Sequence, residues 1–232
     1  MASTPPTNEA FLREVDEELR RDRMVGVWKR WGRWIVAGVI AALALLAGGI
    51  WWNNHRDAQA GVEGEQLATA LEDLSSGKQA GLEPKFRALA ASKSDGTRAA
   101  AALTLADMAM VKGDLRGAAR QFGAIAADAS LDKPYRDLAL IRQTAAEYDT
   151  LPPAQVVARL KPLAMPGNPW FGTAGELTGI AYMRMNQPQL AAALFKALAA
   201  DPGVPETIRS RVVQLAGILG VDAIPQRARA IR

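Results

Sequence analysis

The chain has 232 residues, a formal net charge of +4, one histidine and no cysteine. The absence of cysteine excludes disulfides, thiolate metal ligands and a thiol nucleophile, and a single histidine cannot form a His-pair metal site. The positive charge does not indicate a nucleic-acid-binding protein, because residues 57–232 carry 20 Lys and Arg against 18 Asp and Glu, without a dense basic run.

The N-terminal head divides into two parts. Residues 1–8 are rich in Ser, Thr and Pro and predict a disordered N-terminus. Residues 9–33 predict a cytoplasmic amphipathic helix, acidic in its first half and basic in its second, as the helix dipole favours. One apolar stripe could dock this helix on a partner: Phe11, Val15 and Leu19. A solvated helix whose basic end lies against anionic lipid headgroups is the alternative, and the pattern does not separate the two.

Residues 34–52, WIVAGVIAALALLAGGIWW, predict a transmembrane helix. Nineteen residues at about 1.5 Å each span roughly 28 Å, close to the thickness of a bilayer's hydrocarbon core. Seven Lys and Arg precede the segment, whereas Arg56 is the only one in the next twenty residues. Basic residues stay on the cytoplasmic side, so we expect a single-pass membrane protein with a cytoplasmic N-terminus and with residues 53–232 on the other side of the membrane.

A cleaved signal peptide is the competing interpretation, because Ala58-Gln59-Ala60 resembles the site that signal peptidases accept. The long head and the long apolar run argue against cleavage, since signal cores usually contain about 7–15 apolar residues. We therefore assign residues 53–58 to a linker that follows a retained membrane anchor.

Residues 59–220 predict an all-α repeat domain, because the segment is rich in alanine and has no alternating β pattern. Residues 221–232 predict a flexible basic tail. Gly and Pro separate the expected helices, which cover 59–75, 83–92, 97–112, 115–128, 134–148, 153–163, 169–185, 188–200 and 205–219.

The expected helices share a register of about 36 residues. Turn-forming residues recur at Gly77, Gly113, Asp149 and Asn186. Counting from these turns, the second helices align Leu82, Ala118, Ala154 and Ala191, then Phe86, Phe122, Ala158 and Phe195, then Leu89, Ile125, Lys161 and Leu198. The first helices align Ala70, Ala106, Arg142 and Gly179 as a close-contact column. This arrangement resembles the tetratricopeptide repeat, although the third unit departs from the pattern.

The first helices of a tetratricopeptide stack line its concave face, and the register assigns six candidate partner-binding residues to that face. They are Arg136, Gln143, Glu147, Glu176, Met183 and Arg184. No catalytic, cofactor-binding or metal-binding residues are predicted, because His55 stands alone beside the apolar segment, the carboxylates are scattered, and no Gly-rich phosphate loop is present. We predict a non-enzyme without cofactor, nucleic-acid partner or small-molecule substrate.

The whole arrangement resembles the YfgM-type tetratricopeptide-repeat ancillary subunits of the bacterial Sec translocon, in particular alphaproteobacterial members. The head FLREVDEELRRD, the flank KRWGR and the Ala-rich repeat body carry the likeness. It implies an inner-membrane scaffold that contacts lipid through its anchor and binds Sec subunits, periplasmic chaperones or exported chains. An assembly factor for another envelope complex, such as cytochrome c maturation, and a membrane-tethered hydrolase remain alternatives.

Overall fold

The computed structural model describes the backbone of residues 7–78 and 80–223, with side chains except those of residues 7–29, 35, 56 and 57. The chain divides into two compact units, Met1–Gln59 and Ala60–Arg232. Every regular element among the described residues is an α-helix, which confirms the all-α prediction.

Helix α1, Thr7–Ser75, includes the expected amphipathic helix, the apolar segment and the first helix of the repeat domain. Residues 53–58, predicted as a linker, are helical too, because no Pro or Gly interrupts the chain between Trp52 and Gly61. Of the predicted disordered N-terminus, residues 7 and 8 belong to α1 and residues 1–6 lie outside the described residues.

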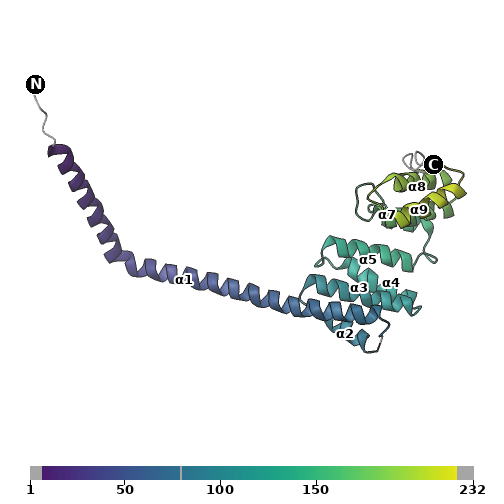
Figure 1. Ribbon diagram of the computed structural model, residues 1–232, viewed down its shortest axis with the longest axis horizontal. Coiled ribbons are helices and arrows are strands. Elements are labelled where there is room, and N and C mark those ends of the chain that lie inside the picture. Colours follow the sequence, from purple (N-terminus) through teal and green to yellow (C-terminus); the bar gives the residue numbers. More distant parts are fainter. Residues whose placement is uncertain (1–6, 79, 224–232) are drawn as a thin grey trace, which may run out of the picture. The chain divides into compact units, whose positions relative to one another are not determined.

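The second unit consists of stacked helical hairpins (Figure 1). The last part of α1 pairs with α2, followed by the pairs α3–α4, α5–α6 and α7–α8 and by the final helix α9. The helices are α2 (Leu82–Leu89), α3 (Asp95–Val111), α4 (Leu115–Ala127), α5 (Lys133–Ala146), α6 (Pro153–Leu160), α7 (Phe171–Arg184), α8 (Pro188–Ala200) and α9 (Glu206–Ile218). All of these bounds lie within three residues of the predicted ones.

Three of the four predicted turn residues have the left-handed backbone conformation that ends a helix. Gly77, Gly113 and Asn186 have φ angles of 81°, 83° and 55°. The backbone N–H of the residue after each turn residue donates to the carbonyl five residues earlier, for example from Asp114 to Ala109 at 3.0 Å. This is the Schellman arrangement, and it satisfies carbonyls that the end of a helix leaves unpaired.

The third hairpin corrects the predicted register. Ala154, Ala158 and Lys161 were aligned with buried columns, yet all three are exposed. The buried residues lie two positions later, at Val156 and Leu160 of α6 and at Leu163 just after this helix.

The first helix of this hairpin is displaced by the same two residues. Thr144, with no exposed surface, replaces Arg142 in the close-contact column. In every hairpin this residue then precedes a large buried side chain by sixteen positions, giving the pairs Ala70–Phe86, Ala106–Phe122, Thr144–Leu160 and Gly179–Phe195. The two additional residues therefore lie between Ala106 and Thr144. Asp149, chosen as a turn residue by spacing alone, lacks the positive φ of the other three.

Each hairpin has a hydrophobic core that the next hairpin completes. Ala101 of α3 joins the core of the first hairpin, Ala139 of α5 that of the second, and Ala174 of α7 that of the third. These bridging alanines have no exposed surface. A small side chain allows two helices to approach closely, so the stack has one interlocked core.

Helix α9 closes the stack at its C-terminal end. Ile208, Val212 and Ala216 pack into the core of the last hairpin, while Thr207, Ser210 and Gln214 are exposed. The outer face is thus mostly polar, with Ile218 at its end exposed, and a mostly polar outer face is typical of a terminal helix that covers the core of a repeat domain. Most of the predicted basic tail, residues 224–232, lies outside the described residues.

Candidate protein-binding surface

The first helices of the hairpins expose one common stripe. Counted from each close-contact residue, the stripe comprises the residues at positions −6, −2, +1 and +5. These four positions lie on one face of the helix. We call it the first-helix stripe, and its more exposed members are Ala68, Leu71, Ser75, Asp107, Val111, Arg142, Thr173 and Arg184, together with Asp149 just after the end of α5. The stripe mixes both charge signs with apolar side chains, and Val111 is 84% exposed.

Polar contacts join consecutive first helices. Arg142 of α5 donates from Nη2 to Asp107 of α3 at 3.3 Å. Arg211 of α9 donates from Nε and Nη2 to the two carboxylate oxygens of Glu176 in α7, at 2.7 and 2.6 Å. The Arg211–Glu176 pair is bidentate, which fixes its orientation as well as adding energy, whereas Arg142 and Asp107 share a single hydrogen bond. Each contact links neighbouring parts of the stack.

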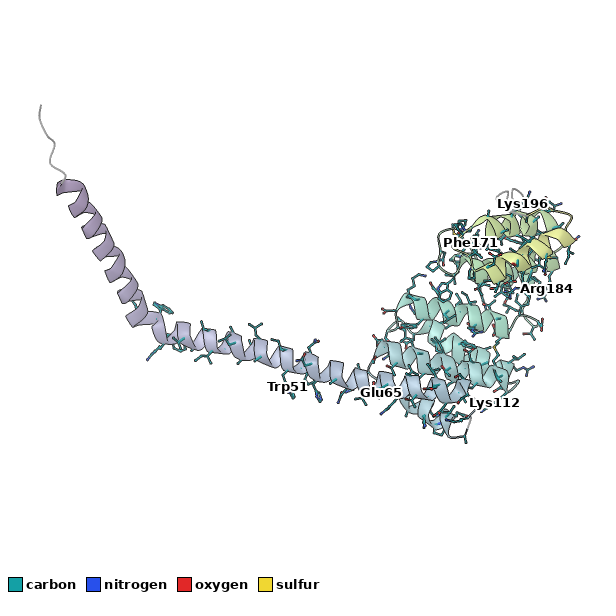
Figure 2. All side chains as sticks on the ribbon, viewed as in Figure 1. Trp51, Glu65, Lys112, Phe171, Arg184 and Lys196 are labelled. Carbon is teal, nitrogen blue, oxygen red and sulfur yellow. The ribbon has the colours of Figure 1, made fainter. Side chains whose placement is uncertain are left out.

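Arg184 connects the third and fourth hairpins at the end of the stripe, and Figure 2 labels it. Its Nη1 donates to the backbone carbonyl of Tyr148 at 2.8 Å, and its guanidinium lies 5.2 Å from the centre of the Tyr148 ring. Burial raises the pKa of the Tyr148 hydroxyl. That hydroxyl donates to the carbonyl of Leu177, so the tyrosine is held by α7 at both ends.

Of the six residues predicted for a partner-binding face, Arg184 alone lies on the first-helix stripe. Three of the six predicted residues lie in the third hairpin, where the predicted register is displaced by two residues. Gln143 packs against Gly123 of α4, and Glu147 forms an ion pair with Arg159 of α6. Arg136 is half-buried, and its Nε has no hydrogen-bond partner among the residues that the structure describes.

The two remaining positions lie in the fourth hairpin. Glu176 is occupied by Arg211, as described above, and Met183 packs against the core of the last hairpin. The sequence analysis missed exposed stripe residues such as Val111, whose signal was an apolar side chain two residues before the turn glycine Gly113. The predicted docking stripe Phe11, Val15 and Leu19 is helical in its backbone, but its side chains lie outside the described ones.

Replacing Asp107 by asparagine tests the inter-hairpin pair. Burial raises the pKa of Asp107, and the attraction of Arg142 only partly opposes this. Because the folded-state pKa lies above the unfolded one, the stability that this group contributes is present at low pH and is lost as pH rises through the raised pKa. We expect Asp107→Asn to become more stable relative to wild type as pH rises from 4 to 7, by less than about 1 kcal/mol since the side chain is partly exposed.

Urea unfolding at several pH values measures this difference. Arg142→Gln is the matched control, because it leaves the carboxylate without its partner and should destabilise the protein more at pH 7 than at pH 4. An Asp107→Asn variant that loses stability relative to wild type on going to pH 7 would contradict the assignment.

The apolar part of α1 is long and hydrophobic enough to cross a membrane, and it is the one such helix among the described residues. Its apolar side chains are exposed in the first unit. Tryptophans stand at both edges, where Arg33 lies 5.8 Å from the ring centre of Trp34 and Trp51 stacks on His55 at 5.6 Å. Indole rings and basic side chains at the ends of an apolar helix are typical of membrane interfaces.

Within the described residues, no group of three or more His, Asp and Glu side chains is placed to hold a metal ion. His55 stacks on Trp51, and its Nε2 lies 3.3 Å from Nε2 of Gln59. Its contacts are thus with neighbouring turns of the same helix.

Stacked α-hairpins with an interlocked core define a helical-repeat domain, a class whose extended surfaces bind other proteins. A family model described as a tetratricopeptide repeat-like domain matches residues 26–216. The chain belongs to this family. No curated protein and no solved structure matches the chain.

Proposed function

We propose that this protein is a membrane-anchored scaffold that binds proteins through its repeat domain in the bacterial periplasm, beside the Sec translocon. The observation that carries the proposal is the combination, within one family match, of a membrane-compatible helix and a tetratricopeptide repeat-like domain. The contrast in basic residues across residues 34–52 supports a cytoplasmic N-terminus and a periplasmic repeat domain. The sequence resemblance to YfgM-type subunits favours the translocon as the neighbour.

The proposed partner-binding surface is the first-helix stripe. Its mixed charges and its exposed Val111 suit an extended or folded protein chain better than a small molecule. Replacing Val111 or Thr173 with a photo-crosslinking amino acid in the full-length protein tests this surface in living cells. We expect capture of Sec subunits, periplasmic chaperones or exported chains.

Capture of haem-maturation proteins alone would replace the translocon by cytochrome c maturation as the site of action. Crosslinking from Ser210, exposed on the outer face of α9, is the control for random encounters. Equal yields from Ser210 and from the stripe would remove the assignment of the surface.

Replacing Leu45 by arginine tests the anchor. Leu45 lies near the middle of the apolar segment and is 79% exposed. We expect membrane insertion to become less favourable by about 2.5–3.5 kcal/mol, because a charge near the bilayer centre loses its hydration. The fraction of the protein that resists carbonate extraction measures this loss, and Leu190→Arg, at an exposed leucine on α8 of the repeat domain, is the matched control. Unchanged extraction of a Leu45→Arg protein would indicate attachment by other means.

A further inference from the structure

A groove of about 490 Å³ opens between the last part of α1 and α2, within the first hairpin. Val62, Ala88 and Leu89 give it an apolar lining, and charged side chains enter it from both helices, Glu65 from α1 and Lys85 from α2. Glu65 is labelled in Figure 2. Val62 is 56% exposed, so apolar surface here meets solvent.

In every later hairpin, one face packs against the preceding hairpin. In the first hairpin, the equivalent face carries the groove. Glu65 stands five residues before Ala70, and each bridging alanine stands five residues before its own close-contact residue. The bridging alanines are fully buried, whereas Glu65 is exposed. The residues directly before the close-contact residues differ in the same way. Leu105, before Ala106, packs on the first hairpin, whereas Thr69, before Ala70, lines the open groove. The groove is therefore the place of a preceding hairpin that the described chain does not supply.

The charges in the groove complement one another across a two-fold axis. The carboxylate of Glu65 has no ion pair within the described part of the chain, and Lys85 has only Asp73 at 3.9 Å. A two-fold axis parallel to α1 lays α1 of one copy over α2 of its partner. Glu65 of each copy then faces Lys85 of the other, so one surface supplies both halves of each pair.

The other end of the stack argues against an open chain of copies. Head-to-tail stacking would place α9 of one copy in the groove of the next, but the outward side chains of α9 are mostly polar, such as Thr207, Ser210 and Gln214, and Ile218 at its C-terminal end is the large apolar one among them. A mostly polar face covers the exposed side chain of Val62 less well than a second groove, which brings its own apolar lining.

We propose that this groove is the interface of a two-fold homodimer formed through the first hairpins of two copies. An axis parallel to residues 60–75 of α1 keeps these segments of the two copies running in the same direction, which suits two copies whose preceding residues enter one membrane, and this point rests on the proposed membrane anchoring. The apolar lining is then covered from both sides, and two Glu65–Lys85 pairs form at the rim.

Single cysteines in the full-length, naturally cysteine-free protein test the dimer in membranes. Gln66→Cys places a thiol on an exposed position of the groove, and Ser210→Cys places one on the outer face of α9. With a short bismaleimide we expect a covalent dimer from Gln66→Cys and little from Ser210→Cys. Adding Glu65→Lys or Lys85→Glu to Gln66→Cys should lower the dimer yield several-fold, because like charges then meet twice across the axis. Combining both reversals should restore it.

Several outcomes would overturn the dimer. These are no dimer from Gln66→Cys although its thiol reacts fully with maleimide, equal yields from both cysteines, crosslinks only to a different protein, or no effect of the single charge reversals. Circular dichroism of the purified variants checks that they are folded. A protein that remains in the membrane but gives no dimer would leave the proposed anchoring intact and remove only the dimer.

Discussion

Replacing Phe195 by alanine is expected to lower the free energy of unfolding by about 3–5 kcal/mol. The side chain has no exposed surface, and its ring lies directly on Gly179 of α7, where even a Cβ atom would overlap it. Glycine lets α7 and α8 approach so closely that only this ring fills the space between them. Truncation removes the ring from the core of the last hairpin and leaves a cavity that the two helices cannot close without moving.

Chemical denaturation of the purified full-length protein measures this loss. Hydrogen–deuterium exchange should be followed in α7 and α8 as well, because repeat domains can unfold in segments. Lys196→Ala, at the next residue and on the exposed face of α8, is the matched control and should change stability by less than about 0.5 kcal/mol. Phe122, also fully buried, should behave like Phe195. Losses below about 1 kcal/mol at both phenylalanines would contradict the hairpin packing.

Replacing Leu160 by alanine is expected to cost about 2–5 kcal/mol. Leu160 has no exposed surface and occupies in α6 the position that Phe86, Phe122 and Phe195 hold in the other hairpins. Its neighbour Ala158 is exposed, so Ala158→Gln should be tolerated within about 0.5 kcal/mol. The strict 36-residue spacing predicts the reverse, because it buries Ala158, and a buried glutamine would lack both space and hydrogen-bond partners.

Thermal or urea unfolding of the two variants in parallel therefore distinguishes the two registers. A severe loss from Ala158→Gln combined with a tolerated Leu160→Ala would restore the spacing that the structure corrects. A third variant, Val156→Ala, should also be destabilising, because Val156 is the fully buried residue one turn before Leu160.

The sequence predicted most helix boundaries because glycine, asparagine and proline act locally. Gly113 ends α3 since glycine accepts the left-handed conformation without strain, and Asp114 then begins α4 by accepting the N–H of Gly117 at 2.8 Å. Proline at the first turn of α8 removes an N–H that has no partner there. Such signals depend on a few neighbouring residues, so they can be recognised without knowledge of the fold.

The third hairpin was misaligned because it lacks this local signal. Its turn contains no glycine, and Pro152 and Pro153 instead determine where α6 begins. Spacing from the preceding glycine then carried a two-residue error into both helices. On a helix two residues correspond to about 200°, so the error exchanged the buried face for another one.

The candidate surface was harder to predict than the fold because exposure depends on distant partners. Glu176 and Glu147 were plausible surface carboxylates, yet Arg211 and Arg159 occupy them. Arg211 lies 35 residues after Glu176, and only the stacking of α9 on α7 brings the two together. Conversely, the exposure of Val111 and Val62 follows from the absence of a packed neighbour among the described residues, which the residue type does not reveal.

The sequence by itself determined the all-α class, the apolar helix and the repeated hairpins, because helix periodicity, helix ends and long apolar runs are written in neighbouring residues. Only the tertiary structure decided the register of the third hairpin, the pairing of charges between first helices and the open groove of the first hairpin. Each of these depends on which faces meet when hairpins stack, and a displacement of two residues along a helix changes that face completely.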